Sequence, residues 1–411
     1  MKTSKALILL LLVFLVLSTI IIAKNHIMVF AANYLPLTAK GAIKAIIKGN
    51  GYEKVSNDYN SKFLPETQFT KLNFKKINLK KLARAEAGYF QKMVKKNNVG
   101  YKSFYIDVIN KKTIVITDAM GNSYLIDNLS KKFNQNNLKP VKKNIKPFKV
   151  LDTFIYDNHI FISHIDQIND CRNFVISKAK INTKSLIYSE FFRDKKCAKF
   201  IQGGRMQRID HNNSSGLLFS IADNIADKPN NEPQSLNSNY GKIIYKDFAK
   251  KNSIIFSMGH RNPQGLLVFD NIVLSTEHGP RGGDEINKIM FGKNYGWPIS
   301  SYGKKYGNTS EYKQSHFDQG FQEPIFAFVP SIGISEIIKV PNDFNINWQN
   351  NFLVASLNKK CLFRIKFNKD YTKLIYIEEI FIGDRIRDIR FYKNKILLAL
   401  EGKGQLGIIS N

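Results

Sequence analysis

The chain has 411 residues, and its 62 Lys and Arg against 33 Asp and Glu give a formal charge of +29. Hydrophobic residues make up 43% and aromatic residues 12%, which excludes a wholly disordered chain and leaves material for a large core. Three cysteines are too few to hold a fold of this size together. Lysines are spread along the whole chain without a recognisable nucleic-acid-binding module, so we expect a solvated basic surface and no nucleic-acid partner.

The first 24 residues have the pattern of an export signal. Lys2 and Lys5 precede an apolar run from Ala6 to Ala23, 18 residues without a charge. At about 1.5 Å per residue, this run nearly spans a bilayer core of roughly 30 Å. Residues 1–24 are therefore expected to be an uncleaved signal anchor or a signal peptide. Since positive charge stays on the cytoplasmic side, we expect the rest of the chain on the periplasmic side of the inner membrane, anchored or secreted.

A basic juxtamembrane helix and a linker are predicted for residues 25–99. Between Leu37 and Lys48, lysines recur every four residues on one face and isoleucines lie on the other. Such a helix either rests on anionic lipid or caps the main domain. Residues 49–82 are polar, rich in Lys and Asn, and typical of a linker.

Short apolar runs recur through residues 100–411, each after a polar turn. Three of these turns have similar sequences, Tyr156-Asp157-Asn158, Phe269-Asp270-Asn271 and Tyr392-Lys393-Asn394. The period of roughly 50 residues predicts an all-β, six-bladed β-propeller, with a pair of β-sandwiches as the alternative. The six runs are Thr113–Thr117, His159–Ser163, Gly216–Ser220, Asn271–Ser275, Asn351–Ala355 and Lys395–Leu400.

Three closely spaced motifs carry the chemistry. Gly259-His260-Arg261-Asn262-Pro263-Gln264-Gly265 places a cation and an amide beside a turn. Residues 276–287, Thr-Glu-His-Gly-Pro-Arg-Gly-Gly-Asp-Glu-Ile-Asn, form a Gly-rich loop whose oxygens suit a hard cation such as Ca²⁺. Residues 294–298 read Asn-Tyr-Gly-Trp-Pro. Taken singly, each is equally consistent with a tight turn between strands.

Together and in this order, the motifs closely resemble the soluble glucose/sorbosone dehydrogenase family, the PQQ-dependent aldose sugar dehydrogenases. Gly203-Gly204-Arg205, Pro330-Ser331-Ile332 and residues 383–389, Gly-Asp-Arg-Ile-Arg-Asp-Ile, also match. The resemblance covers about residues 100–405 and is strongest from 255 to 300. It implies a six-bladed propeller, which agrees with the repeat period.

The resemblance also implies two cofactors. PQQ is an o-quinone with three carboxylates, so its site requires several cations at hydrogen-bonding range. In the family, a Ca²⁺ held by backbone carbonyls binds PQQ and polarises its reactive carbonyl, and some members hold a second Ca²⁺. The matching PQQ-binding positions are Arg261, Asn262, Gln202, Arg385 and Arg387. The matching metal positions are Gly279 and Pro280 for the first Ca²⁺, and Glu285 and Tyr295 for the second.

The implied reaction oxidises the C1 hydroxyl of an aldose sugar and passes electrons to a periplasmic acceptor. The family's general base is a His four residues before the Gly-Gly-Arg arginine, and here that position is Ile201. Arg261 is carried over as a catalytic residue. His211, six residues beyond Arg205, is a conceivable displaced base but is expected to occupy a loop. Loss of a general base typically costs about 10²–10⁴ in rate. A slow dehydrogenase and a degenerate propeller that binds a sugar, metal or protein partner without oxidation both remain open.

The cysteines have separate interpretations. Cys171 and Cys197 flank one repeat, in a region where family members often carry cysteines, and an exported protein can form a disulfide there. Cys361 lies in an apolar strand pattern and is expected to be a buried thiol.

Overall fold

The computed structural model describes residues 72–85, 100–127, 129, 138–198, 200–224, 231–305 and 312–410. The predicted export signal and juxtamembrane helix lie outside the described residues. Among those that are described, no helix is long and apolar enough to cross a membrane. The described chain is built from strands and three short 3₁₀ helices, η2 (Glu232–Gln234), η3 (Phe317–Gln319) and η4 (Ile346–Trp348).

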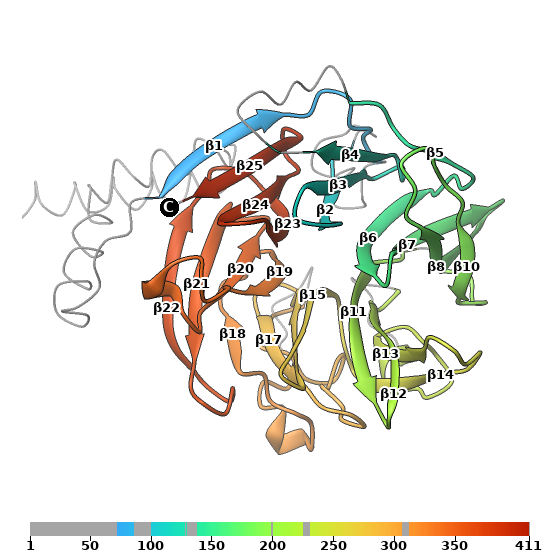
Figure 1. The fold of residues 1–411 in the computed structure, drawn as a ribbon. Helices are drawn as coiled ribbons and strands as arrows, with labels where there is room; N and C mark the ends of the chain where they lie inside the picture. Colours follow the sequence, from blue (N-terminus) through green and yellow to red (C-terminus); the bar gives the residue numbers. More distant parts are fainter. Residues whose placement is uncertain are drawn as a thin grey trace, which may run out of the picture. The chain divides into compact units, whose positions relative to one another are not determined.

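Six antiparallel sheets are arranged around one axis as the blades of a propeller (Figure 1), which confirms the predicted fold. The first three blades in chain order contain β2 (Phe104–Val108), β3 (Thr113–Asp118) and β4 (Ser123–Asp127); β6 (Lys149–Tyr156), β7 (His159–Ile168), β8 (Cys171–Lys180) and β10 (Ser189–Arg193); and β11 (Gly203–His211), β12 (Ser214–Ile221), β13 (Lys242–Asp247) and β14 (Ser253–Met258). A short parallel pair, β5 (Lys142–Lys143) and β9 (Ser185–Leu186), accompanies them.

The remaining three blades complete the ring. They contain β15 (Pro263–Phe269), β16 (Ile272–Glu277), β17 (Asp284–Ile289) and β18 (Phe326–Phe328); β19 (Ile334–Lys339), β20 (Phe352–Ser356), β21 (Cys361–Phe367) and β22 (Leu374–Phe381); and β23 (Ile386–Phe391), β24 (Lys395–Leu400), β25 (Gln405–Ser410) and β1 (Asn73–Asn78).

Each of the six apolar runs found in the sequence falls on the second strand of a blade. That strand has a neighbouring strand on both sides within its sheet. The repeated polar phrase is the tight turn that precedes it. Asp157 and Asn158 have φ of 46° and 56°, and Asp270 and Asn271 have φ of 46° and 61°. Positive φ at both central residues is the requirement of a two-residue hairpin turn that follows strand twist, and Asn and Asp tolerate it best.

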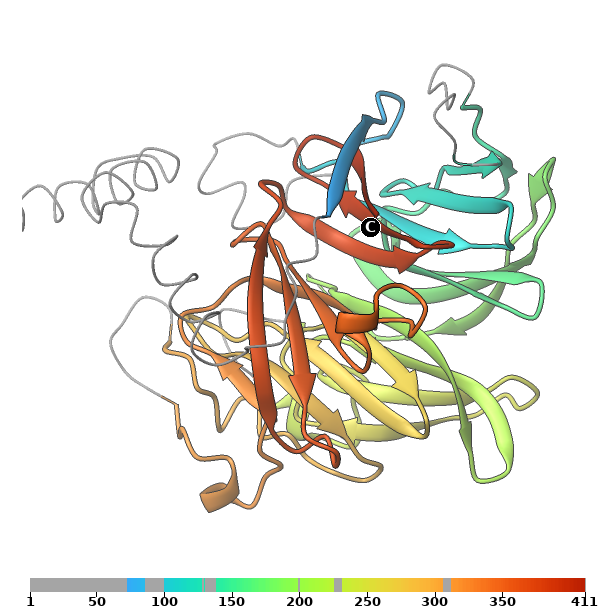
Figure 2. The ribbon, with the colours of Figure 1, turned by 60° about the vertical axis from the view of Figure 1, so that its left-hand side comes forward.

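The last blade joins the two ends of the described chain. β1 pairs antiparallel with β25, from Asn73 opposite Ser410 to Asn78 opposite Gln405. Figure 2 shows β1, in blue, alongside the red C-terminal strands. The prediction that residues 49–82 are linker, and that the propeller begins at residue 100, was therefore wrong for residues 73–78. The outermost strand faces solvent almost throughout, so its sequence lacks apolar alternation.

The core consists of apolar layers between neighbouring blades. One layer joins Leu151 and Phe174 of the second blade to Met206 and Phe219 of the third. The disulfide Cys171–Cys197 lies in this region, with an S–S distance of 2.02 Å, as predicted. Cys361 is a buried free thiol, also as predicted.

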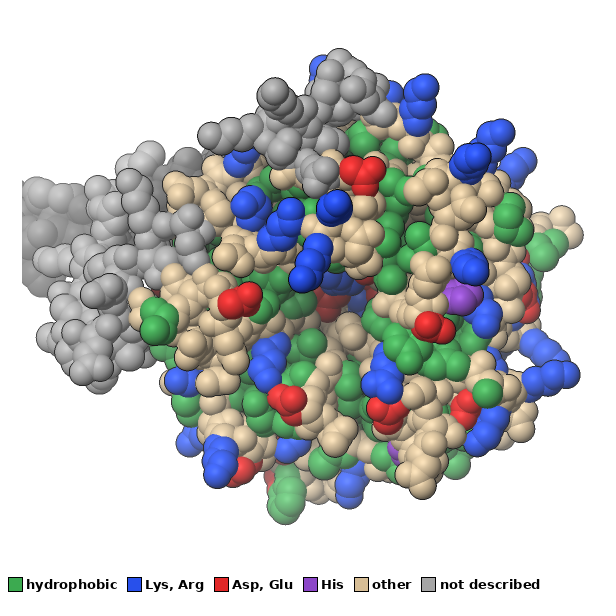
Figure 3. All heavy atoms as spheres, in the orientation of Figure 1, with side chains coloured by type: hydrophobic (Ala, Val, Ile, Leu, Met, Phe, Trp, Pro, Cys, Tyr) green, Lys and Arg blue, Asp and Glu red, His purple; other side chains and the backbone are tan. Residues whose placement is uncertain are grey.

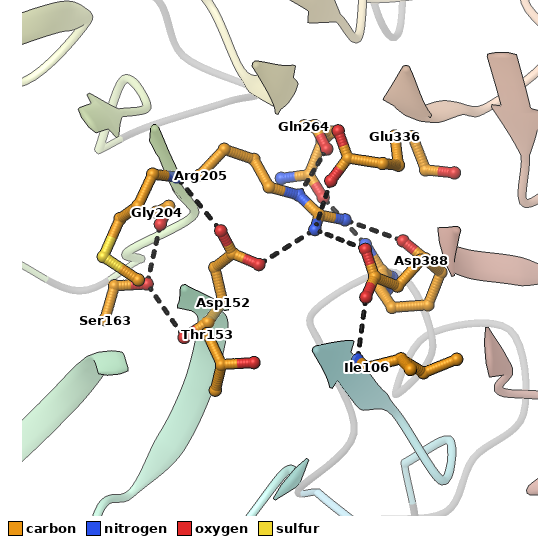
Figure 4. Close-up of polar contacts among 12 residues, drawn as sticks. Ile106, Asp152, Thr153, Ser163, Gly204, Arg205, Gln264, Glu336 and Asp388 are labelled. Carbon is orange, nitrogen blue, oxygen red and sulfur yellow. Dashed lines mark hydrogen bonds and ion pairs between the residues drawn. The ribbon is translucent and has the colours of Figure 1, made fainter. Parts of the chain in front are cut away.

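The propeller axis is filled by an ionic cluster around Arg205, which is 2% exposed (Figure 4). Its Nη1 lies 3.0 Å from Asp152 Oδ1, 2.7 Å from Glu336 Oε2 and 3.0 Å from Asp388 Oδ1. We call these residues, together with Asp107 and Arg390, the axial hub. Burial is the main force that raises the pKa values of Asp152 and Glu336, and it raises the pKa of Asp107 to about 7.

The axial hub fixes the relative level of all six inner strands. Arg205 Nε donates to the Gln264 carbonyl of β15 at 2.7 Å, and Asp388 accepts from the Ile106 amide of β2 at 2.8 Å. Gly204, at φ +90°, makes the approach of β11 to β6 possible, since a Cβ there would lie 2.5 Å from Leu151 Cβ. The contacting residues lie near the starts of their strands, so the inner strands all begin at the same end of the axis.

Candidate functional site

The candidate site lies where the inner strands begin, one layer above the axial hub. Gln202 precedes β11, Asn262 precedes β15, and Arg387 is the second residue of β23. Because these strands share one direction around the axis, residues distant in sequence meet at one mouth. Figure 3 shows a hollow at the centre of one face of the body, with Lys and Arg side chains around it.

A chain of hydrogen bonds crosses this mouth through three blades. Asn262 Nδ2 donates to Gln202 Oε1 at 2.7 Å, and Gln264 Nε2 donates to Asn262 Oδ1 at 2.9 Å. Arg387 Nη1 then donates to Gln264 Oε1 at 2.7 Å. The predicted residues Gln202, Asn262 and Arg387 are thus brought together. Gln264 links them; it is part of the sequence motif at residues 259–265, but it was not predicted as a site residue.

Glu401 holds the two arginines of β23 and its preceding loop. Arg385 Nε lies 2.9 Å from Glu401 Oε1, and Arg387 Nε lies 2.8 Å from Glu401 Oε2. Ser103 Oγ donates to the same carboxylate at 2.7 Å. Burial opposes ionisation of this carboxyl, but Arg387 and Arg385 outweigh it and lower the pKa of Glu401 to about 2. One fully buried anion therefore orients two predicted cofactor-binding cations, and nothing in the sequence motif indicated it.

Arg261 is the third predicted cation, and it lies beside His278. Arg261 Nη1 donates to the His278 carbonyl at 3.0 Å, and its guanidinium lies 5.3 Å from the centre of the Trp297 ring. Burial, followed by the nearby Arg261, Arg387 and Arg385, lowers the pKa of His278 to about 4 despite the opposing effect of Asp284. His278 is therefore neutral at physiological pH, and its surroundings favour an anion.

A small cavity is lined by Arg261 and by three of the four predicted metal positions. Gly279, Glu285 and Tyr295 line it, whereas Pro280 does not. Burial, followed by the neighbouring Glu277, raises the pKa of Glu285 well above its usual range. A cation in the cavity would favour the ionised carboxylate again.

The donor set of the cavity is mixed. Asn287 does not line the cavity, but its Nδ2 donates to Glu277 Oε1 at 2.6 Å and to Glu285 Oε2 at 3.2 Å, while its Oδ1 is buried without a partner. Ser300 Oγ is likewise buried without a partner. In the described part of the chain, no group of three or more His, Cys, Asp or Glu side chains is arranged for a metal. A cation here would rely on carbonyl, amide and hydroxyl oxygens, which suit Ca²⁺.

The position of the family's general base is occupied by the apolar core. Ile201 is 4% exposed and packs with Leu151 and Met206. His211, the alternative base, is at the opposite end of β11 from Gly203 and lies against the Phe291 ring at 4.6 Å. At about 3.3 Å per residue, it is roughly 20 Å from the level of Arg205. His211 is therefore not placed to replace the base, and it is the last residue of β11 and not part of a loop as expected.

The chain matches known proteins over most of its length. The sequence model for Glucose / Sorbosone dehydrogenase matches residues 106–409. The aldose sugar dehydrogenase YliI of Escherichia coli is 35% identical over 159 residues, which are 37% of this chain and 42% of that protein. Quinoprotein glucose dehydrogenase B of Acinetobacter calcoaceticus is 29% identical over 192 residues, 33% of this chain and 40% of that protein. Each alignment thus spans about two fifths of the curated relative.

Solved structures share the fold across nearly their whole length. The apo-form aldose sugar dehydrogenase of Escherichia coli superposes with a TM-score of 0.66 at 20% identity, covering 83% of this chain and 99% of that one. The PQQ-bound aldose sugar dehydrogenase of Streptomyces coelicolor gives a TM-score of 0.57 at 16% identity, covering 84% and 99%. Since the family model covers most of the chain, the protein belongs to the glucose/sorbosone dehydrogenase family.

Proposed function

We propose that this protein is a PQQ- and Ca²⁺-dependent dehydrogenase that oxidises the C1 hydroxyl of aldose sugars. The observation that carries the proposal is the cationic mouth, where Arg385 and Arg387 are oriented by a single buried carboxylate, Glu401. Two fixed guanidiniums with one counter-charge suit a ligand with several carboxylates. Family relatives named as quinoproteins and as PQQ-bound structures support the identity of that ligand.

The residues present fit PQQ. Arg385 and Arg387 would bind its carboxylates, Arg261 would add a third cation, and the amides of Asn262 and Gln202 would donate hydrogen bonds to its polar edge. Their mutual hydrogen bonds already fix their orientation, so little side-chain entropy is lost on binding. PQQ, when bound, supplies the quinone that accepts two electrons and the C1 hydrogen.

The residues of the adjoining cavity fit Ca²⁺. Glu285 and the Tyr295 carbonyl would hold one Ca²⁺ and the Gly279 carbonyl the other, and the buried, unpartnered Ser300 Oγ of the lining is a further available oxygen. Pro280, which does not line this cavity, would contribute its carbonyl to the same ion as Gly279. A cation beside Glu285 would offset the burial and the repulsion by Glu277 that together raise the Glu285 pKa.

A second candidate function is binding without oxidation, and the buried Ile201 favours it. An isoleucine packed among Leu151 and Met206 neither accepts a proton nor faces a substrate. Under this alternative the cationic mouth binds an anion or a sugar, and the Ca²⁺ loops are structural.

Reconstitution of the full-length protein in detergent separates the two candidates. PQQ with Ca²⁺ is titrated and followed by absorbance, and dye-linked oxidation is then measured over a panel of aldoses. Saturable binding with aldose-dependent turnover is expected. Binding without turnover on any aldose establishes the second candidate, and absence of PQQ binding rejects the first.

We further propose that the propeller is exported, tethered by residues 1–24, and reduces a periplasmic electron acceptor. The charged and apolar pattern of those residues motivates this, and the Cys171–Cys197 disulfide supports it because disulfides persist in oxidising compartments. The test is fractionation combined with thiol alkylation. Membrane-associated protein in which only Cys361 is alkylated before reduction is expected, and cytosolic protein with three reactive thiols contradicts the proposal.

A further inference from the structure

Lys149 occupies the mouth of the propeller at the level of the missing base. It is the first residue of β6 and lies three positions before Asp152, just as Gln202 lies three positions before Arg205. Asp152 and Arg205 are paired across the axial hub, and their strands run in the same direction. Lys149 therefore lies beside the start of β11, at the layer that contains Gln202 and the candidate site.

The Lys149 ammonium differs from Arg385 and Arg387 because it is not paired with Glu401. Within the residues that the structure describes, its side chain makes no hydrogen bond or ion pair, whereas Arg385 and Arg387 share Glu401. Burial, followed by the nearby Arg387, lowers the pKa of Lys149 to about 8, and Glu401 opposes this only in part. A substantial fraction of the protein therefore holds a neutral amine here near pH 8.

We propose that Lys149 is the general base of the oxidation, in the role that Ile201 cannot fill. The inference rests on the proposed function. The C1 hydroxyl of the aldose gives its proton to Lys149 Nζ while the C1 hydrogen leaves with two electrons as hydride for the quinone cofactor. The sugar becomes a lactone, and the ammonium afterwards returns its proton to solvent. Charge and atoms balance with the quinone as the only oxidant.

The other titratable groups around the start of β6 are poorly suited to this task. From β2, Tyr105 has a pKa raised mainly by burial, and Asp107 with a pKa of about 7 is buried in the axial hub. From β7, His164 is buried, with its pKa lowered mainly by burial to about 4. The remaining neighbours, Arg205 of β11, Arg387 and Glu401, stay ionised. Lys149 alone among these combines partial exposure at the mouth with a pKa near 8.

The first test reads the amine directly, without cofactor. Full-length protein is labelled with trace acetic anhydride across a pH series, and each lysine is quantified by peptide mass spectrometry. We expect the reactivity of Lys149 to reach half its maximum near pH 8, with the exposed Lys366 of β21 as the internal reference. A Lys149 midpoint that coincides with that of the reference overturns the inference whatever the activity is.

The second test separates proton transfer from charge. Lys149→Ala should lower turnover by about 10²–10⁴, and Lys149→Arg should lower it as much, because arginine keeps the positive charge but does not release its proton. Small primary amines should restore turnover to Lys149→Ala. PQQ binding, followed by absorbance, should change less than about tenfold in both variants, which also shows that they are folded.

The outcomes separate failure of this inference from failure of the proposed function. Wild-type turnover that Lys149→Arg retains shows that only the charge matters and overturns the inference, while the proposed function stands. Wild-type protein that binds PQQ but never turns over overturns the inference and establishes the non-oxidising alternative. Wild-type protein that does not bind PQQ rejects the proposed function, and the inference falls with it.

Discussion

The axial hub and the mouth above it are built on the same strands, yet they balance charge in opposite ways. At the hub, Arg205 and Arg390 face four carboxyl groups, Asp107, Asp152, Glu336 and Asp388. At the mouth, the side chains of Arg385 and Arg387 both pair with one carboxylate, Glu401. The hub has anions in excess and the mouth has cations in excess.

This difference in charge balance indicates that the hub has a structural role and that the mouth binds the ligand. The excess acid of the hub is sealed from solvent, so burial raises its pKa values and protons can complete the balance. The excess positive charge of the mouth is partly open to solvent and is carried by arginines, which do not release a proton. An external anion is what would complete it, which is why we place the ligand there and not in the hub.

Removal of the hub's central cation should have the largest effect. Arg205→Leu leaves Asp152, Glu336 and Asp388 buried without their shared partner. We expect loss of about 3–5 kcal/mol in the free energy of unfolding, measured by chemical denaturation, because breaking a buried ionic group exposes the cost of its desolvation.

Arg208 provides a matched control on the same strand, β11. Its guanidinium is 39% exposed and pairs with Asp210 at 2.5 Å. Arg208→Leu should cost less than about 1 kcal/mol, as is usual for surface pairs. Equal losses in the two variants would show that the hub is not the structural centre of the propeller.

Neutralising the single anion of the mouth should have the next largest effect. The pKa of Glu401 falls from a usual 4.5 to about 2 on folding, so its ionised form stabilises the protein above pH 4.5. That stabilisation is lost as pH falls from about 4.5 towards 2. Glu401→Gln should therefore cost on the order of 2–3 kcal/mol at pH 7. Unfolding curves of the two proteins should converge near pH 2, and a constant gap would contradict the assignment.

Loss of one mouth cation should affect ligand binding more than stability. Arg387→Gln removes a charged donor, and a charge-assisted hydrogen bond is worth roughly 1.5–3 kcal/mol. PQQ affinity should fall about 10- to 100-fold in absorbance titrations, because each 1.4 kcal/mol is tenfold. Arg208→Gln, three residues beyond Arg205 on β11, should leave affinity unchanged. An unchanged PQQ affinity in Arg387→Gln would show that the ligand does not bind at this mouth.

Much of the fold was predictable from the sequence because its signal is repeated. The second strand of a blade is buried on both faces and follows a turn that requires Asn or Asp, so apolar runs and polar phrases recur together. β1 was missed because an outer strand is exposed and carries no such pattern.

The candidate site was predictable only in part, through motifs. Gln202, Asn262, Arg385 and Arg387 do meet. Glu401 and Lys149 were missed because they lie outside the sequence motifs and reach the site only through the folding of the chain. Glu401 follows the last apolar residue of β24, and Lys149 resembles any other lysine in a chain that is rich in them. Only the convergence of the inner strands distinguishes them.

The excess acid of the hub gives the smallest and most specific prediction. Asp107 accepts from Thr153 Oγ1 at 2.5 Å and lies 3.5 Å from Arg390, but burial still raises its pKa from 3.8 to about 7. Because the folded protein binds this proton more tightly than the unfolded chain does, Asp107 destabilises the fold progressively as pH rises from about 4 to 7. Asp107→Asn keeps an oxygen for Thr153 and has no proton to lose.

We therefore expect Asp107→Asn to change the free energy of unfolding by less than about 1 kcal/mol at pH 5. At pH 8 the variant should be more stable than the wild type by on the order of 1–2 kcal/mol. Denaturation curves at the two pH values give both numbers. A variant that is less stable than the wild type at pH 8 would mean that the ionised Asp107 is required by Arg390, and the hub would then hold no surplus of negative charge. The contrast with the mouth would disappear, and with it the reason for assigning the anion to one layer of the axis.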